Sequence, residues 1–268
     1  MLRVGSVPYV VARPLDLALE DEPEIELVRD VPSRLVEDLR AGRIDVALVS
    51  SIELFRTPGY TYLDGLAVAG RGYVSSVQVF LRRPIEAVGS VALDPASRTS
   101  AALAQTVWPD HTPRVPKFIE VPEGRDPSRA GTDAWLRIGD PAFREYLERN
   151  LPATFNPSEA WTERTGLPFV FAVWMAREGV DLTPWVPAFK RAYIAGRERL
   201  NDIIQDAARS WDASPVFTRN YLAHECLYWP GREMTPSLLA WRDAAAALDL
   251  CRKDVEPTPI SVPALASS

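Results

Sequence analysis

A hydroxyl-rich strand–helix junction is the segment of this sequence best suited to binding chemistry. Residues 91–103 have the pattern of an apolar strand, a turn and a helix start that carries Ser97, Arg98, Thr99 and Ser100. The free N–H groups and the dipole of a helix start attract anions, and the hydroxyls and the guanidinium add donors for a carboxylate. The alternative is a capped helix whose arginine points to solvent, and the spacing favours neither interpretation.

Polar residues also follow two other predicted strands. Ser51 follows the apolar run 45–49, and Asp140 follows the run 134–138 and precedes Pro141. Both can serve simply as helix caps, because Ser and Asp are good N-caps and Pro suits the first helical turn. Each also stands at the carboxyl end of a strand, where α/β proteins bind ligands.

Two aromatic residues occupy comparable positions. Tyr9 comes soon after the first predicted strand, where it can line a cleft or pack in a core. Trp174 ends the apolar run 169–174, which is more typical of a strand core than of a ligand site. Its position at the end of the run also suits the hinge side of a cleft.

Several chemistries lack the residues that they need. The sequence has no G-x-x-x-x-G-K-[ST] loop for phosphates and no H-E-x-x-H pair for zinc. It has two histidines, His111 and His224, and two cysteines, Cys226 and Cys251. A histidine-based metal centre, a Ser-His-Asp triad and a thiolate zinc site are therefore not expected.

Length and charge narrow the class of protein further. The chain has 268 residues, 47% of them hydrophobic and 25% charged, as is typical of one or two globular domains. Asp and Glu outnumber Lys and Arg by 36 to 30, which argues against a nucleic-acid partner but not against an anionic substrate. The sequence contains no run of 18 apolar residues and no secretory leader pattern, so we expect no membrane partner and a cytoplasmic location.

The order of the predicted elements indicates two lobes. Strand-like and helix-like segments alternate in the first part, which predicts a mainly parallel sheet. This rhythm restarts after Pro84, and the sequence from Leu182 shows only helical periodicity before a tail rich in Pro, Ser and Ala. We therefore expect an α/β protein whose first lobe is residues 1–84 and 172–268, with residues 85–171 inserted as a second lobe.

A cleft between these lobes would be lined by the loops that follow the strands. The predicted substrate contacts are the polar and aromatic residues of these loops, together with Ser76 and Trp174. This predicted set consists of Tyr9, Ser51, Ser76, Ser97, Arg98, Thr99, Ser100, Asp140 and Trp174. We expect a substrate carboxylate at the Ser97–Ser100 helix start, with Ser51 or Ser76 reaching it from the other lobe.

At these residues the sequence resembles the menaquinone-biosynthesis enzymes of the futalosine route, in their chorismate dehydratase branch. The most specific similarities are SRTS at residues 97–100 and TGLPFVFAVW at 165–174. Further similar segments are VGSVPY at 4–9, RPL at 13–15, PSRL at 32–35, DVALV at 45–49 with Ser51, SSV at 75–77, ALD at 92–94 and IGD at 138–140. Together they extend over most of the chain.

This resemblance implies a periplasmic-binding-protein-like fold of type II, with two crossing strands and C-terminal helices. It also implies loss of water from the dianion chorismate to give 3-[(1-carboxyvinyl)oxy]benzoate, with no metal or organic cofactor. The family is thought to use the substrate's own enolpyruvyl carboxylate as the base. The family commonly has an Asn that faces the substrate where this chain has Val11.

Two alternatives remain open from the sequence. One is a non-catalytic protein of the same fold that binds a small anion. The other is the sister branch, 1,4-dihydroxy-6-naphthoate synthase, which has a different version of the anion loop and a cleft histidine. The oligomeric state is not predicted by any of these patterns.

Overall fold

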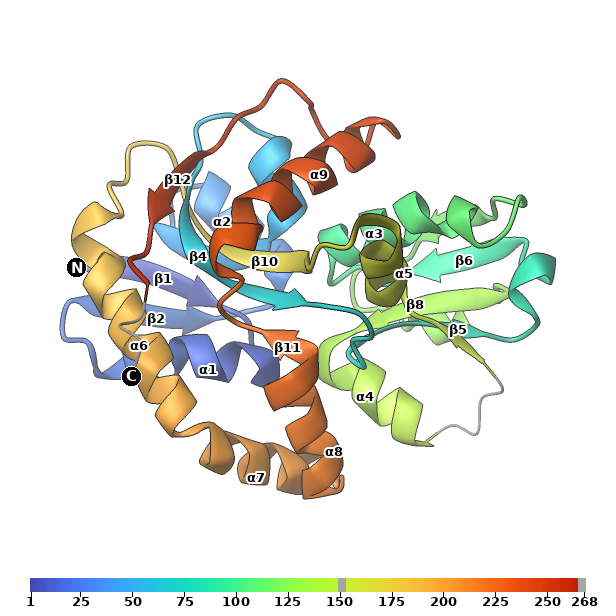
Figure 1. Cartoon of the computed structure of the whole chain (residues 1–268), viewed down its shortest axis with the longest axis horizontal. Coiled ribbons are helices and arrows are strands. Elements are labelled where there is room, and N and C mark those ends of the chain that lie inside the picture. Colours follow the sequence, from blue (N-terminus) through green and yellow to red (C-terminus); the bar gives the residue numbers. More distant parts are fainter. Residues whose placement is uncertain (149–152, 265–268) are drawn as a thin grey trace.

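The computed structural model describes residues 1–148 and 153–264 and contains two sheets, each in its own lobe. Figure 1 shows the first lobe on the left, with the N-terminus, and the second lobe on the right, around β5, β6 and β8. The two-lobe α/β architecture expected from the sequence is therefore present. No helix among the described residues is long and apolar enough to cross a membrane.

The sheet of the first lobe has seven strands and combines both ends of the chain. Its strand order is β11-β4-β10-β3-β1-β2, and β12 pairs with β4 beside this path. The strands are β1 (Leu2–Ser6), β2 (Ile25–Arg29), β3 (Val46–Ser50), β4 (Thr61–Gly70), β10 (Phe169–Ala176), β11 (Cys226–Leu227) and β12 (Thr258–Ser261). Strands β1, β2 and β3 run parallel, whereas β10 is antiparallel to both β3 and β4.

Every residue of β3 is buried, which explains its uninterrupted apolar sequence. The helices that surround this sheet are α1 (Arg13–Asp16), α2 (Pro32–Arg40), α6 (Val186–Glu198), α7 (Leu200–Trp211), α8 (Pro215–Asn220) and α9 (Met234–Ala246). Figure 1 shows α9 on one side of the lobe and α6, α7 and α8 in succession along the other.

The C-terminal part is not purely helical, contrary to the expectation from its periodicity. The short strands β11 and β12 both pair with β4, β11 antiparallel and β12 parallel to it. Residues 258–261, expected in the tail, thus complete the first sheet. Strands as short as these show no clear alternation of apolar and polar residues. Their extended conformation depends on pairing with β4 rather than on their own sequence.

The second lobe has a five-stranded sheet with the order β7-β6-β8-β5-β9. Its strands are β5 (Val77–Leu81), β6 (Ser90–Leu93), β7 (Lys117–Glu120), β8 (Ala134–Ile138) and β9 (Thr154–Phe155). Its helices are α3 (Arg98–Val107), α4 (Gly139–Glu148) and α5 (Pro157–Thr165). The Asn156 side chain caps α5 by accepting from the Glu159 N–H, and Gly166 ends it in the left-handed conformation.

The chain passes between the sheets earlier than the boundaries expected after residues 84 and 171. Strand β5 was expected in the first lobe, but it pairs with β8 and β9 in the second sheet. The returning strand β10 pairs with β4 of the first sheet from Phe169 onward. An apolar sequence predicts that a strand is buried, but it does not predict which sheet the strand joins. The expected lobe boundaries therefore lie a few residues too late in the sequence.

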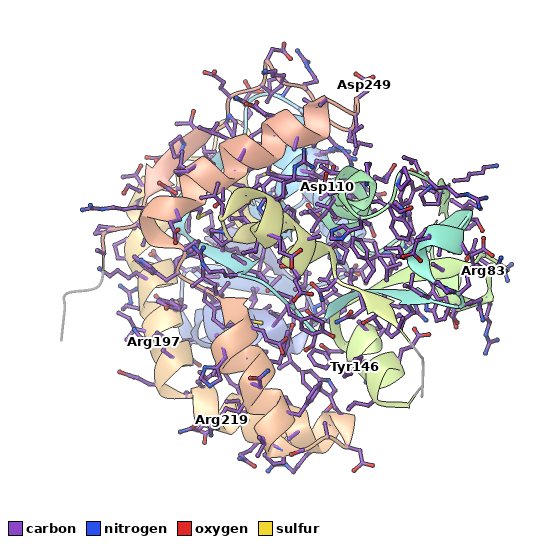
Figure 2. The ribbon with its side chains drawn as sticks, turned by 45° about the vertical axis from the view of Figure 1, so that its right-hand side comes forward. Arg83, Asp110, Tyr146, Arg197, Arg219 and Asp249 are labelled. Carbon is purple, nitrogen blue, oxygen red and sulfur yellow. The ribbon has the colours of Figure 1, made fainter. Side chains whose placement is uncertain are left out.

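The surface carries most of the charge. Figure 2 shows Arg83 and Asp110 at the outside of the second lobe, and Arg197, Arg219 and Asp249 at the outside of the first. Most buried apolar side chains form one cluster that continues through the contact between the lobes. A second, small cluster in the second lobe consists of Phe80, Ala92, Val121 and Trp135. The larger cluster holds the loops at the carboxyl ends of the parallel strands opposite one another.

Candidate active site

A cavity of about 80 Å³ lies between the two lobes. First-lobe residues that line it come from the loop after β1, the end of β3, strands β4 and β10, and the segment near Tyr221. Second-lobe residues come from the start of α3 and the β8–α4 junction. The polar or aromatic side chains in its wall are Tyr9, Ser50, Ser76, Ser97, Ser100, Phe171, Tyr221 and Cys226.

The start of α3 forms the wall on the second-lobe side. Ser97 caps the helix, because its Oγ accepts the Ser100 N–H at 3.1 Å. The Ser97 hydroxyl in turn donates to the Ser100 Oγ at 3.0 Å. The cap therefore leaves the Ser100 hydroxyl proton available for a group in the cavity. Among the described residues, no acceptor bonds the Arg98 or Thr99 backbone N–H, as expected for a helix start that binds anions.

Ser76 and Tyr221 form a hydroxyl pair on the first-lobe side. The Tyr221 hydroxyl donates to the Ser76 Oγ at 2.8 Å. Tyr221 begins a single π-helical turn, Tyr221–Glu225, directly after α8, and such turns are often found at functional sites. Burial raises the pKa of Tyr221 well above its usual value, so this phenol stays protonated.

Tyr9 lies where the first loop meets the second lobe. Its ring contacts Gly139, where a β-carbon would lie 3.1 Å from the ring and where φ is +63°. Burial, then the nearby Asp94 and Asp140 charges, raise the pKa of Tyr9 to about 12. Glycine at residue 139 thus permits the close approach of the lobes, and Tyr9 is a neutral donor at ordinary pH.

Asp140 connects the lobes rather than facing the cavity. Its carboxylate accepts the Val10 N–H from the first lobe at 3.4 Å. Burial raises the pKa of Asp140 above its usual value, while hydrogen bonds oppose that shift. Asp140 therefore lies outside the cavity wall and bonds to the loop that carries Tyr9, and its contact with substrate stays a prediction.

Ser51 and Thr99 are also used in contacts other than the cavity wall. The Ser51 hydroxyl donates to the Val170 carbonyl at 2.6 Å, within the first lobe. The Thr99 Oγ1 accepts the Ile52 N–H at 3.1 Å, which joins α3 to the 3₁₀ turn Ser51–Phe55 of the first lobe. Both side chains are fully buried, and these bonds use the hydroxyl proton of Ser51 and an oxygen lone pair of Thr99.

Arg98 points away from the cavity, toward Glu53 of the first lobe. The Glu53 side chain is fully buried and lies between three guanidinium groups. Its oxygens are 2.5 Å from Arg40, 2.8 Å from Arg56 and 3.4 Å from Arg98. The sequence left open whether Arg98 faces solvent or binds an anion in the cavity. In the structure it does neither, because its guanidinium pairs with Glu53.

Trp174 packs in the core of the first lobe. It is fully buried, pairs with Leu48 across β10 and β3, and contacts the Phe189 ring with centroids 4.9 Å apart. Its predicted place at the hinge side of the cleft is not observed. Phe171, three residues earlier in the same strand, lines the cavity instead. The strand-core interpretation of Trp174 thus describes its position.

Tyr221 and Cys226 line the cavity but are not among the residues predicted from the sequence. Tyr221 belongs to the π-helical turn and Cys226 to β11, more than 100 residues after α3 in the sequence. No local sequence pattern predicts that either residue faces the same cavity as the start of α3. Burial, with its Tyr228 and Tyr221 hydrogen bonds opposing, raises the pKa of Cys226 to about 12. Val11, the position at which the family commonly has Asn, is also in the cavity wall.

The cavity wall contains no Arg, Lys or His side chain among the described residues. Its ionisable members are Tyr9, Tyr221 and Cys226, whose pKa values are all raised and which are therefore neutral near pH 7. No group of three His, Cys, Asp or Glu side chains arranged for a metal ion occurs in the part of the chain that the structure describes. The arrangement can bind an anion through hydroxyls and backbone N–H groups, in a largely apolar enclosure.

The fold and the interlobe site define a two-lobe α/β protein of the periplasmic-binding-protein-like class. Protein AF1704 from Archaeoglobus fulgidus has a similar structure, with a TM-score of 0.73 and 17% identity over 93% of this chain and 98% of that chain. The alkanesulfonate-binding protein SsuA from Xanthomonas axonopodis pv. citri, bound to MOPS, superposes with a TM-score of 0.65 and 16% identity over 97% and 98% of the chains.

Sequence comparison identifies the family. A family model described as menaquinone biosynthesis matches residues 2–246, a range that includes every residue of the cavity wall. Chorismate dehydratase from Thermus thermophilus is 31% identical over 82% of this chain and 86% of that protein. Chorismate dehydratase from Campylobacter jejuni is 35% identical over 63% and 64% of the two chains. The chain belongs to the menaquinone biosynthesis family.

Proposed function

We propose that this protein is a chorismate dehydratase, which removes water from chorismate to give 3-[(1-carboxyvinyl)oxy]benzoate in menaquinone biosynthesis. The observation that carries the proposal is the similarity to a protein of that name over 82% of the chain. The interlobe cavity supports it, because the α3 start and the serine hydroxyls suit the carboxylates of a dianion. A cytoplasmic location accords with a biosynthetic role.

The lining residues indicate where the proton of the substrate goes. The reaction breaks a ring C–H bond and a ring C–O bond, and the lost hydrogen and hydroxyl leave together as water. Tyr9, Tyr221 and Cys226 are protonated near pH 7, so none of them is a base for the ring hydrogen. We propose that the substrate's own enolpyruvyl carboxylate takes this proton, while the protein holds the reactive conformer and excludes water.

The lobes must separate before such a substrate can enter. The cavity of about 80 Å³ has room for a few water molecules, whereas pockets for drug-sized ligands measure roughly 300–1,000 Å³. The contacts of Thr99 with Ile52 and of Asp140 with Val10 therefore open and re-form in each cycle. We propose that the moving second lobe extends from β5 to α5, residues 77–165, rather than over residues 85–171.

The test is incubation of the purified protein with chorismate, with and without a metal chelator. We expect a new aromatic absorbance and a product lighter than chorismate by one water, at the same rate in both samples. No product after overnight incubation at high enzyme concentration would overturn the proposal. Tight binding of chorismate without turnover would identify an anion-binding protein, and conversion of a cyclic futalosine substrate would instead assign the naphthoate synthase reaction.

A further inference from the structure

The π-helical turn Tyr221–Glu225 contacts two adjacent serines of the segment that connects β4 with β5. The Tyr221 hydroxyl donates to the Ser76 Oγ at 2.8 Å. Glu225 accepts the Ser75 N–H at 2.7 Å through one carboxylate oxygen and the Ser75 hydroxyl at 2.8 Å through the other. One turn of the first lobe therefore holds both serines where the chain passes toward the second lobe.

The direction of the Tyr221–Ser76 hydrogen bond determines what Ser76 can do. Tyr221 is 1% exposed, and its ring lies 4.3 Å from that of Phe143 on α4, which keeps water from the hydroxyl. In this bond the phenol is the donor, so Ser76 accepts and its own proton is left for another acceptor. Among the described residues no acceptor takes this proton, and Ser76 lies in the cavity wall.

The opposite wall has the same arrangement. Ser97 accepts the Ser100 N–H and donates to the Ser100 Oγ, so the Ser100 hydroxyl proton is also available. Ser76 and Ser100 line one cavity, in a wall without a cationic side chain among the described residues. Each lobe thus presents one serine hydroxyl whose accepting position is occupied by a neighbouring hydroxyl donor.

We infer that Tyr221 is a positioning residue for the binding of an anionic group, because its hydrogen bond orients the Ser76 hydroxyl as a donor into the cavity. Without that bond Ser76 is free to turn and present its lone pairs, which repel a carboxylate. The class of group bound is a carboxylate, and its identification as part of chorismate rests on the function proposed above. The substitution Tyr221→Phe removes the hydroxyl and retains the ring that packs on Phe143.

The experiment is a double-mutant cycle with Tyr221→Phe and Ser76→Ala, measured as kcat, KM and the Kd for chorismate. We expect Ser76→Ala to lower kcat/KM by about tenfold or more, as for a hydrogen bond to a charged group. We expect Tyr221→Phe to lower it by about three- to tenfold, mainly through KM. In the Ser76→Ala background Tyr221→Phe should then change kcat/KM by less than about twofold, because its effect passes through Ser76.

The control is Tyr62→Phe, which removes another buried tyrosine hydroxyl, one that contacts Thr235 at 3.3 Å and lies outside the cavity wall. We expect it to leave kcat/KM unchanged. Ser76→Thr keeps a hydroxyl and should keep the sensitivity to Tyr221→Phe. Wild-type kcat/KM and Kd in Tyr221→Phe, or equal losses in both backgrounds, would overturn the inference. If the wild type binds chorismate without turnover, the proposed function fails, and the same cycle in Kd still decides the role of Tyr221.

Discussion

The two sides of the α3 start offer different groups to a negative charge. On the cavity side, Ser76, Ser100 and Tyr221 present neutral hydroxyls. On the other side, Arg56 and Arg98 line a groove of about 630 Å³ and contact the buried Glu53. The full charges thus lie around Glu53, where Arg40 and Arg56 belong to the same lobe, and neutral hydroxyls lie on the side of the proposed ligand.

The cost of burying charge explains this division. An arginine in the small cavity would lose its hydration and have no counterion whenever the ligand is absent. A serine hydroxyl can bond to water in the empty site and to a carboxylate in the filled one. Glu53 lies in the first lobe together with Arg40 and Arg56, so these two arginines stay paired with it when the second lobe moves as proposed above. The pair with Arg98 spans the two lobes and opens with them.

The largest effect is expected on the arginine side, for Glu53→Gln. This substitution keeps the side-chain shape and removes the charge that three arginines share. We expect the free energy of unfolding to fall by about 3 kcal/mol, because removing one partner of a buried ion pair leaves the others uncompensated. Chemical denaturation of both proteins measures this difference.

Glu233→Gln is the matched control for Glu53→Gln. Glu233 pairs with Arg71 at 2.7 Å, but its side chain is 51% exposed, so its loss should change stability by less than about 1 kcal/mol. Equal small effects of both substitutions would contradict the distinction between a buried cluster and an ordinary surface pair.

On the cavity side, we expect Ser100→Ala to lower kcat/KM for chorismate by roughly tenfold to a hundredfold, as for loss of a hydrogen bond to a charged group. The melting temperature should change little, because Ser97 and not Ser100 supplies the helix cap. Steady-state kinetics and a thermal melt check the two parts. Ser237→Ala, which removes a buried hydroxyl on α9 outside the cavity wall, should leave kcat/KM unchanged. Wild-type kcat/KM in Ser100→Ala would mean that the α3 start is only a capped helix.

Thr99 stands between Arg98, which pairs with Glu53, and Ser100, which lines the cavity. A substitution of Thr99 therefore tests whether this residue stabilises the fold or contacts the substrate. Thr99→Val removes the acceptor of the Ile52 N–H and leaves that buried group unpaired. We expect a loss of stability of about 1–2 kcal/mol, measured by denaturation. Thr106→Val on the same helix removes only a bond to the Ala102 carbonyl within the helix, and it should cost less. A pure loss of substrate binding in Thr99→Val, with stability unchanged, would assign Thr99 to the cavity.

The smallest effect concerns Asp45, a second carboxylate between arginines, which precedes β3 whereas Glu53 follows it. Burial opposes ionisation, but hydrogen bonds from Arg3 and Arg177 prevail and lower the pKa of Asp45 to about 2. Because the pKa in the folded state is the lower one, its stabilisation is complete above about pH 4 and is lost as the pH falls toward 2.

We therefore expect Asp45→Asn to lower stability by about 1 kcal/mol at pH 7. The difference from wild type should be constant between pH 5 and 8 and shrink below pH 4, as measured by denaturation at each pH. A difference that grows on acidification would contradict this assignment of the charge.

The local sequence predicted much of the architecture. The runs around β1, β3, β6 and β8 are apolar because these strands are mostly buried, and the junction at residues 97–100 has the hydroxyls of a capped helix. Two lobes followed from the strand–helix rhythm. Ser76, Ser97, Ser100 and Tyr9 do line the cavity between them.

The sequence could not assign partners. Four residues have the types and spacing of ligand contacts, but each forms a hydrogen bond with a protein group that the sequence does not reveal: Ser51, Thr99, Arg98 and Asp140. Strand β5 has the same apolar pattern in either sheet, and β11 and β12 are too short to have a pattern. Tyr221 has no local signal because its partner Ser76 is distant in the sequence.

The sequence by itself determined most of the strands and helices and which helix starts carry donors, because those properties depend on neighbours a few residues apart. The tertiary structure alone decided which donors remain free. A hydroxyl proton or a guanidinium is available to a ligand only when no protein acceptor takes it. For Arg98 that acceptor, Glu53, comes from a distant part of the chain, whereas the distant partners of Thr99 and Ser76 are donors. Here the packing of one lobe against the other separates the groups that hold the protein together from those that face its substrate.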